Sequence, residues 1–252
     1  MIFVLAPREN WICDRLTEEW TEYNRSITSG SPQEADVIWL LAGWCWNQIH
    51  PNILMSKRVV VTIHHEVPDK LTDAKIANFK MRDQFVDVYH TPSDKTAEIV
   101  RKLTNKPVVT IPYWLNKKIW VPTDTNYREK YGLSDDDFVI GSFQRDTEGH
   151  DLITPKLEKG PDRFCDFIER NSESFKDVNV NVLLGGWRRQ YVVSRLQAAG
   201  VRYQLHELVG IKALREMYSC CNLYIVGSRY EGGPQSVLEA PAMRVPIISI
   251  DV

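Results

Sequence analysis

The sequence predicts an α/β protein of two successive domains, each built from parallel strands covered by helices. Short apolar runs alternate with amphipathic segments along the 252 residues, which is typical of a parallel sheet with crossover helices. The alternation stops at residues 116–137, where Pro122, other polar residues and an acidic SDDD run precede a new apolar run. We therefore interpret residues 1–115 and 138–252 as two domains joined by a linker.

The first domain is expected to be Rossmann-like, because five strand-like runs alternate with helical segments. Residues with apolar side chains at helical spacing predict a helix at 11–23, and Ser93 is a suitable N-cap for a second helix through residue 103. The expected strands are residues 1–6, 35–42, 58–64, 86–89 and 107–112.

The second domain repeats the pattern with four expected strands and four expected helices. The strands are residues 138–143, 178–184, 223–226 and 246–250, and the helices are 163–169, 191–199, 211–220 and 235–243. Gly200 follows its helix at the position that favours a left-handed backbone. A doubly wound domain would ordinarily continue beyond the last of these strands, so we expect the C-terminal domain to be incomplete.

Composition narrows the class of protein. A formal net charge of -2 lacks the basic surplus of a nucleic-acid-binding protein, and 43% hydrophobic residues suit a folded chain. The five cysteines have no metal-type spacing and fit a reduced, cytoplasmic protein. No run approaches the roughly 20 apolar residues that a membrane helix needs. Clustered tryptophans leave peripheral membrane contact open: Trp44, Trp46, Trp114 and Trp120.

The most informative segment is GSRYEGGPQSVLEAPAMRVPIIS at residues 227–249. An apolar strand leads into a turn with Gly232 and Gly233, and a helix is expected to begin at about Pro234. Glycines allow a ligand to approach the backbone, and free N–H groups at a helix start favour an anion such as a diphosphate. Glu231 precedes the turn, and Glu239 lies within the helix where it could accept hydrogen bonds from a polyhydroxyl group.

This segment resembles the signature of retaining GT-B glycosyltransferases of family 4, the glycosyl transferases group 1, whose typical form is EGFGLxxLEAMAxGxPVI. The resemblance implies that Glu231 contacts the donor sugar as a catalytic residue and that Glu239 binds the ribose of the nucleotide. Gly232 and Gly233 would bind the donor phosphates. The sequence departs from the pattern at three positions, which are Pro234, Pro241 and Arg244. The prolines remove backbone N–H groups, and Pro241 would kink its helix.

A second match lies at the start of the second domain. GSFQRDTEG followed by LEKGPDRF resembles the G-R-x-x-x-x-K-G region of the same family, with a longer loop between the basic residues. The resemblance implies that Arg145 and Lys159 neutralise the donor diphosphate, and Lys156 competes for the same role. The segment 203–210 resembles the one that frames the nucleotide base.

The first domain matches the family more loosely. VVVTIHHEVPD resembles a strand that ends in a histidine near the acceptor, so His64 is a second catalytic candidate. Functional groups gather at the carboxyl ends of parallel strands. His65 and Glu66 follow, and no third ligand that would make a metal site accompanies the two histidines. The loop PRENW lacks the glycine pair of the family.

The resemblance implies transfer of a sugar from a nucleotide-diphosphate donor, with UDP or GDP, to a hydroxyl acceptor. The acceptor would be a glycan, a lipid-linked glycan or a small molecule, the anomeric configuration would be retained, and no cofactor or essential metal would be needed. Three alternatives stay open: a sugar-nucleotide epimerase, a non-catalytic nucleotide-sugar-binding remnant, and a metal-dependent GT-A transferase using Asp135-Asp136-Asp137. That acidic run precedes a strand instead of following one, which favours a linker. A dinucleotide-dependent dehydrogenase is disfavoured, since no G-x-G-x-x-G follows either opening strand.

Overall fold

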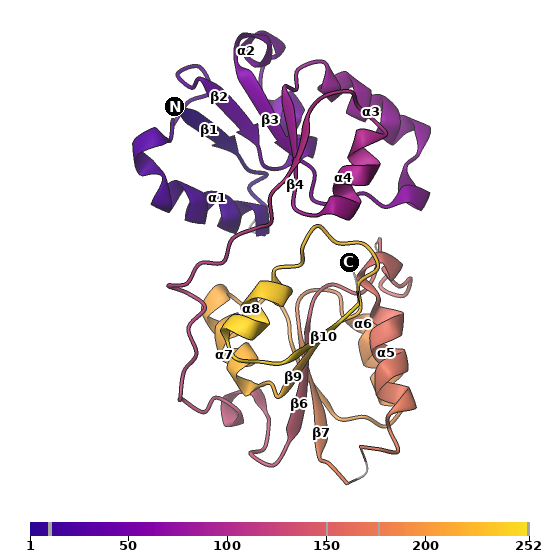
Figure 1. Cartoon of the computed structure of the whole chain (residues 1–252). Helices are drawn as coiled ribbons and strands as arrows, with labels where there is room; N and C mark the ends of the chain where they lie inside the picture. Colours follow the sequence, from indigo (N-terminus) through magenta and orange to yellow (C-terminus); the bar gives the residue numbers. More distant parts are fainter. Residues whose placement is uncertain (10–11, 150, 176, 251–252) are drawn as a thin grey trace. The chain divides into compact units, whose positions relative to one another are not determined.

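The chain folds into two compact units, Met1–Tyr113 and Trp114–Val252. The computed structural model describes residues 1–9, 12–149, 151–175 and 177–250. Each unit contains one sheet of five parallel strands (Figure 1). The expected α/β class with two Rossmann-like sheets is therefore confirmed.

Unit 1 has its strands in sequence order, β1-β2-β3-β4-β5. Its core forms around β2 and β3, where alternate residues such as Ile38, Leu40, Val59 and Val61 are almost fully buried. The strands are β1 Ile2–Leu5, β2 Val37–Leu40, β3 Arg58–Thr62, β4 Val88–Thr91 and β5 Val108–Thr110. The helices are α1 Ile12–Tyr23, α2 Pro51–Ser56, α3 Asp73–Asp83 and α4 Asp94–Arg101.

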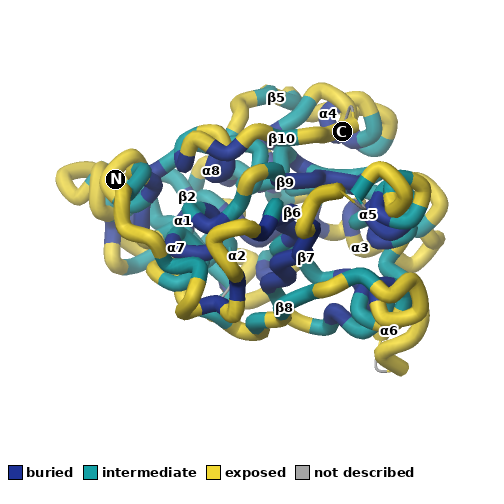
Figure 2. Tube along the Cα trace, turned by 90° about the horizontal axis from the view of Figure 1, so that it is seen from below, coloured by how far each residue is buried: buried dark blue, intermediate teal, exposed yellow. Residues whose placement is uncertain are grey.

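Unit 2 has the strand order β10-β9-β6-β7-β8. Every residue of β7 is buried, as are the four central residues of β6, so both strands lie in the centre of the unit (Figure 2). The strands are β6 Phe138–Phe143, β7 Val180–Gly185, β8 Tyr203–His206, β9 Leu223–Val226 and β10 Ile247–Ser249. The helices are α5 Pro161–Arg170, α6 Gln190–Ala198, α7 Ile211–Cys220 and α8 Ser236–Ala242.

The winding of unit 2 creates a switch point between β6 and β9. Helices α5 and α6 lie on one side of the sheet, and α7 and α8 lie on the other (Figure 1). The chain leaves β6 towards β7 and later returns to place β9 on the opposite side of β6. Open α/β sheets bind their ligands at the carboxyl ends of the strands, beside such a switch point.

Most of the expected elements are present with small shifts of their ends. The strand at 138–143, the helix at 211–220 and the strand at 223–226 have the predicted bounds. Ser93 accepts a hydrogen bond from the Thr96 N–H as an N-cap, and Gly200 has a φ of 65°. Trp11, the first residue of the expected helix at 11–23, lies outside the described residues.

The structure also corrects details. The strand expected to reach His64 ends at Thr62, so His64 lies in the loop that follows β3. Strand β8 and helices α2 and α3 were not predicted. The stretch interpreted as a linker packs within unit 2, where Trp120 is buried against Tyr218 and Val226.

The four tryptophans that left membrane contact open differ in exposure. Trp120 is buried, Trp46 and Trp114 are partly buried, and Trp44 is 52% exposed. Trp46 stacks on Phe85 with ring centroids 5.8 Å apart. Among the helices that the structure describes, none combines the length and apolar character needed to cross a membrane.

Candidate functional site

The loops that follow β6 and β9 meet at the switch point of unit 2. Gly160 has a φ of 64°, and a Cβ on it would lie 1.8 Å from the carbonyl oxygen of Gly227. A Cβ on Gly227 would in turn lie 2.7 Å from the carbonyl oxygen of Gly160. Only glycines allow this backbone contact, because any side chain would force the two loops apart.

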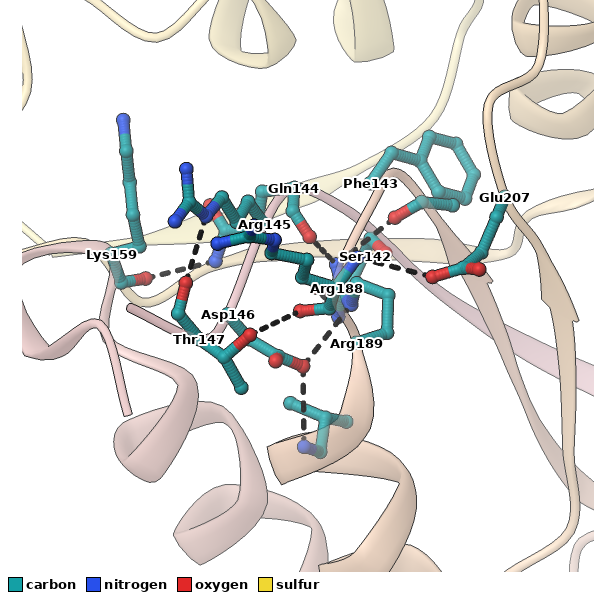
Figure 3. A network of polar contacts seen from close by, with 12 residues as sticks. Ser142, Phe143, Gln144, Arg145, Asp146, Thr147, Lys159, Arg188, Arg189 and Glu207 are labelled. Carbon is teal, nitrogen blue, oxygen red and sulfur yellow. Dashed lines mark hydrogen bonds and ion pairs between the residues drawn. The ribbon is translucent and has the colours of Figure 1, made fainter. Parts of the chain in front are cut away.

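Backbone hydrogen bonds fasten the two loops together. The N–H groups of Arg229 and Tyr230 donate to the carbonyl of Glu158 at 2.8 and 3.2 Å. From the end of β6, the Gln144 side chain donates to the carbonyl of Lys159 at 2.8 Å (Figure 3). These contacts fix the position of Lys159, which ends the short 3-10 turn Leu157–Lys159.

Two candidate residues that are far apart in the sequence form an ion pair here. Lys159 Nζ lies 2.5 Å from Glu231 Oε1, and the Ser228 hydroxyl donates to the same oxygen at 3.1 Å. Both charged side chains are mostly shielded, with exposures of 20% for Lys159 and 10% for Glu231. The ammonium and the carboxylate are thus held side by side at the switch point.

Two further cations lie in the neighbourhood of Lys159. Arg145 Nε donates to the Thr147 carbonyl at 2.8 Å, and its guanidinium lies 5.8 Å from the centre of the Trp187 ring. Lys156 pairs with Glu158 at 3.4 Å. Burial lowers the pKa of Lys156, the carboxylate of Glu158 opposes this shift, and the positive charges of Lys159 and Arg145 add to it. Three cations that lie close together can attract a multiply charged anion, although Lys156 and Lys159 are each paired with a carboxylate here.

A buried ion pair supports the loop that carries these cations (Figure 3). Arg189 Nε lies 3.3 Å from Asp146 Oδ2, and both side chains are 1% exposed. Arg189 also donates to the carbonyls of Ser142 and Gly185 at 3.0 and 3.1 Å and to that of Gln144. Burial raises the pKa of Asp146 to about 6, although Arg189 opposes this rise. The pair joins the ends of β6 and β7.

The glycine turn and α8 complete the arrangement. Gly233 adopts a φ of 75°, which an L side chain rarely adopts. The helix begins at Ser236, two residues after Pro234, so Pro234 precedes the helix instead of opening it. Glu239 follows on α8 with an exposure of 3%, and its Oε2 accepts a hydrogen bond from the Tyr218 hydroxyl at 3.0 Å.

Comparison with known proteins identifies the family. The family model of the glycosyl transferases group 1 matches residues 125–252, just over half of the chain. The chain belongs to this family. The match confirms the resemblance carried by the Glu231 segment and covers all of the candidate residues of unit 2.

Solved glycosyltransferase structures share the fold of this group 1 chain. Alr3699/HepE of Anabaena, in complex with UDP and glucose, is 11% identical with a TM-score of 0.74, and the match covers 98% of this chain and 79% of HepE. Sucrose-phosphate synthase of Thermosynechococcus elongatus is 18% identical with a TM-score of 0.65, covering 97% and 62%. TarM is 12% identical with a TM-score of 0.63, covering 94% and 44%. No curated protein matches the chain.

The long loop that departs from the group 1 pattern is a hairpin-like excursion. Thr147 and Pro155 form an antiparallel bridge, and the Lys156 N–H donates to the Asp146 carbonyl at 2.8 Å. Residues 147–155 therefore leave the loop and return to the same place, although His150 lies outside the described residues. Without them, four residues would separate Arg145 from Lys159, which is the spacing of the group 1 motif.

Two other departures have a local explanation. Arg244 stands where the group 1 pattern often has glycine, and it adopts a φ of 63°, in the region that favours glycine. Pro241 lies one residue before the end of α8, so its missing N–H affects only the last turn.

His64 lies in unit 1 with both ring nitrogens in contact with protein groups. Nε2 lies 2.8 Å from the Leu41 carbonyl and 3.4 Å from Cys13 Sγ, and Nδ1 contacts the Tyr113 hydroxyl. The network assigns the proton to Nε2, which donates to the carbonyl, while Nδ1 accepts from the phenol. Burial raises the pKa of the Cys13 thiol to about 12, so this group stays neutral.

Sequence reasoning missed four residues that build the site. Gly160 and Gly227 allow the loop contact, Ser228 binds Glu231, and Arg189 supports the loop. The glycine after Lys159 and the Gly-Ser step after β9 were available signals. Nothing in the run WRRQ distinguishes the buried Arg189 from its neighbour Arg188.

Proposed function

We propose that the chain transfers a sugar from a nucleotide-diphosphate donor, UDP- or GDP-linked, to a hydroxyl acceptor, with retention of anomeric configuration. The observation that carries the proposal is the Lys159–Glu231 pair at the switch point of unit 2. Such a donor needs a cation next to a carboxylate. The cation binds its diphosphate, and the carboxylate binds its sugar hydroxyls.

The proposed chemistry follows from the charges. Breaking a sugar–diphosphate bond leaves negative charge on the diphosphate and an oxocarbenium-like sugar. Lys159 and Arg145, with the N–H groups of Gly232 and Gly233, would stabilise the departing diphosphate. An incoming diphosphate competes with Glu231 for Lys159, and the released carboxylate can then accept hydrogen bonds from the donor sugar. Glu239 would bind the ribose.

The proposal also covers the donor nucleotide, the acceptor, the cellular location and the role of His64. UDP is named in the complexes of HepE, which supports UDP as the donor nucleotide. We propose a carbohydrate or lipid-linked acceptor, a cytoplasmic location with peripheral membrane contact through the exposed Trp44, and no cofactor. In unit 1 we propose that His64 takes part in the transfer on the acceptor side.

Donor turnover tests the proposal. Nucleoside diphosphate released from UDP-glucose, UDP-N-acetylglucosamine and GDP-mannose is measured for the whole chain, with and without simple sugar acceptors. We expect release from one donor and its loss in Glu231→Ala, whereas Glu129→Ala, an exposed carboxylate of the same unit, keeps it. Proton NMR of the product reports retention. An epimerised donor formed without any acceptor, or binding without turnover, would overturn the proposal.

A further inference from the structure

The carboxylate of Glu239 on α8 is held by a buried phenol on α7. Tyr218 is 1% exposed and donates its hydroxyl hydrogen to Glu239 Oε2 at 3.0 Å. The two helices lie on the same side of the sheet (Figure 1). Tyr218 belongs to an apolar cluster that also contains Ala240, the residue after Glu239. A charged acceptor in such surroundings gains more from a hydrogen bond than it would in water.

The Tyr218 ring is packed by aromatic rings from three other parts of unit 2. Its centroid lies 5.6 Å from that of Trp120, 4.8 Å from that of Phe143 and 5.2 Å from that of Tyr224. The hydroxyl of Tyr224 in turn accepts the Phe143 N–H at 2.8 Å. A ring enclosed in this way has little room to move, so its hydroxyl is held beside the carboxylate that it binds.

Tyr218 is the donor in this pair. Burial raises the pKa of Tyr218 well above its ordinary value, and the neighbouring Tyr224 and Glu239 raise it further. The phenol therefore keeps its proton and donates it to the carboxylate. An ionised carboxylate has about four acceptor positions, so one bond from Tyr218 is compatible with further bonds from a ligand.

We propose that Tyr218 is a positioning residue that orients Glu239 to accept the hydroxyl groups of the donor ribose. This inference rests on the proposed function, because it requires that Glu239 bind the nucleotide. Ribose recognition then depends on a residue of α7 that itself touches no ligand. A purely structural pair would instead contribute to folding and leave the recognition of ribose unchanged.

The test compares nucleotides with and without ribose hydroxyls. Calorimetry on the whole chain measures binding of UDP and of 2′,3′-dideoxy-UDP, with the corresponding GDP pair in parallel. Tyr218→Phe removes one oxygen and keeps the ring. The matched control is Tyr131→Phe, because Tyr131 is another buried phenol of unit 2 that donates to a carboxylate, at 2.7 Å from Glu216 Oε2.

We expect the wild type to prefer the ribonucleotide by about tenfold or more, as hydrogen bonds to a charged group imply. In Tyr218→Phe this preference should fall to about twofold or less. The variant should lose affinity for the ribonucleotide, whereas its affinity for the dideoxy compound should change little. Tyr131→Phe should keep the wild-type preference. Equal losses for both nucleotides in Tyr218→Phe, or an unchanged preference, would overturn the inference while leaving the proposed function in place.

A second variant keeps the test decisive if Tyr218→Phe folds poorly. Glu239→Gln should also lose the preference for ribose, and a retained preference would overturn the inference. In a folded double variant, Tyr218→Phe should reduce the preference no further, because both changes act through one carboxylate. If the wild type binds neither UDP nor GDP, the proposed function fails first, and this inference falls with it.

Discussion

Replacing Arg189 with methionine should destabilise unit 2 more than any surface substitution. The change leaves Asp146 as a buried carboxylate without its counter-ion, 3.3 Å from where the guanidinium was. It also removes the donor that serves the carbonyls of Ser142 and Gly185. Breaking a buried pair from one side costs about 3–5 kcal/mol, a large part of the roughly 5–15 kcal/mol that holds a domain folded.

Urea unfolding followed by far-UV circular dichroism at pH 7.5 measures this loss. The control is Arg202→Met, because Arg202 is 55% exposed and its partner Asp137, which is 2% exposed, keeps hydrogen bonds from the Ser134 N–H and the Asn181 side chain. An exposed partner contributes little, so the control should lose less than about 1 kcal/mol. The double variant Asp146→Asn/Arg189→Met should recover part of the loss, since it leaves no buried charge.

The same variant has a distinctive pH dependence. Burial already raises the pKa of Asp146 to about 6, and removal of Arg189 should raise it further because the opposing positive charge is gone. At pH 5 the protonated acid needs no counter-ion, so the cost of Arg189→Met should be smaller than at pH 7.5. A cost below about 1 kcal/mol at pH 7.5, or one that grows on acidification, would refute the reasoning.

Three further predictions concern the site and its support. Gly160→Ala should lose several-fold in nucleotide affinity and at least about 2 kcal/mol of stability, because its Cβ would meet Gly227 at 1.8 Å. Gly200→Ala, with the same sign of φ and no atom within 4 Å, should lose only about 1 kcal/mol in the same unfolding assay. Replacing residues 148–154 with two glycines should leave nucleotide binding by calorimetry within about twofold of wild type, because it keeps the Thr147–Pro155 bridge and the Thr147 carbonyl that Arg145 contacts, and shortening the loop changes the closure entropy little. Loss of nucleotide binding in this variant would show that the excursion is part of the site. Finally, the raised pKa of Asp146 means that the folded chain keeps a proton that the unfolded chain releases as the pH rises from about 4 to about 6. The stability of the wild type relative to Asp146→Asn should therefore fall by up to about 3 kcal/mol over that window, and a rise would contradict the shift.

The sequence predicted the parts of the fold in which local pattern and burial agree. The run FVIGSF is apolar because β6 lies in the middle of a covered parallel sheet, and its bounds were predicted correctly. Strand β8 was missed because it is an edge strand with four residues, YQLH, that are at most half-buried. Helix α3 was missed because only Phe79 and Arg82 of its eleven residues are buried, which leaves a weak apolar stripe.

In the candidate site, too, the sequence predicts the features that lie within one segment and misses those that depend on packing between segments. The spacing of Glu231 and Glu239 is a local pattern that can be read from one segment, and the ion pair with Lys159 is consistent with the role inferred for it. The contact of Gly160 with Gly227 joins loops 67 positions apart, so no local pattern encodes it. Burial of Arg189 and the orientation of Tyr218 depend on packing between elements, which residue types alone do not specify.

Calorimetric titration of UDP, GDP and ADP into the whole chain tests the central claim most directly. The account predicts saturable binding of UDP or GDP and a loss of about tenfold or more in Lys159→Ala, because a cation that contacts the diphosphate is removed. Lys130→Ala is the control, since Lys130 forms an equivalent pair with Glu216 at 2.5 Å elsewhere in unit 2. Absence of binding for both UDP and GDP, or equal affinity in Lys159→Ala and wild type, would contradict the account.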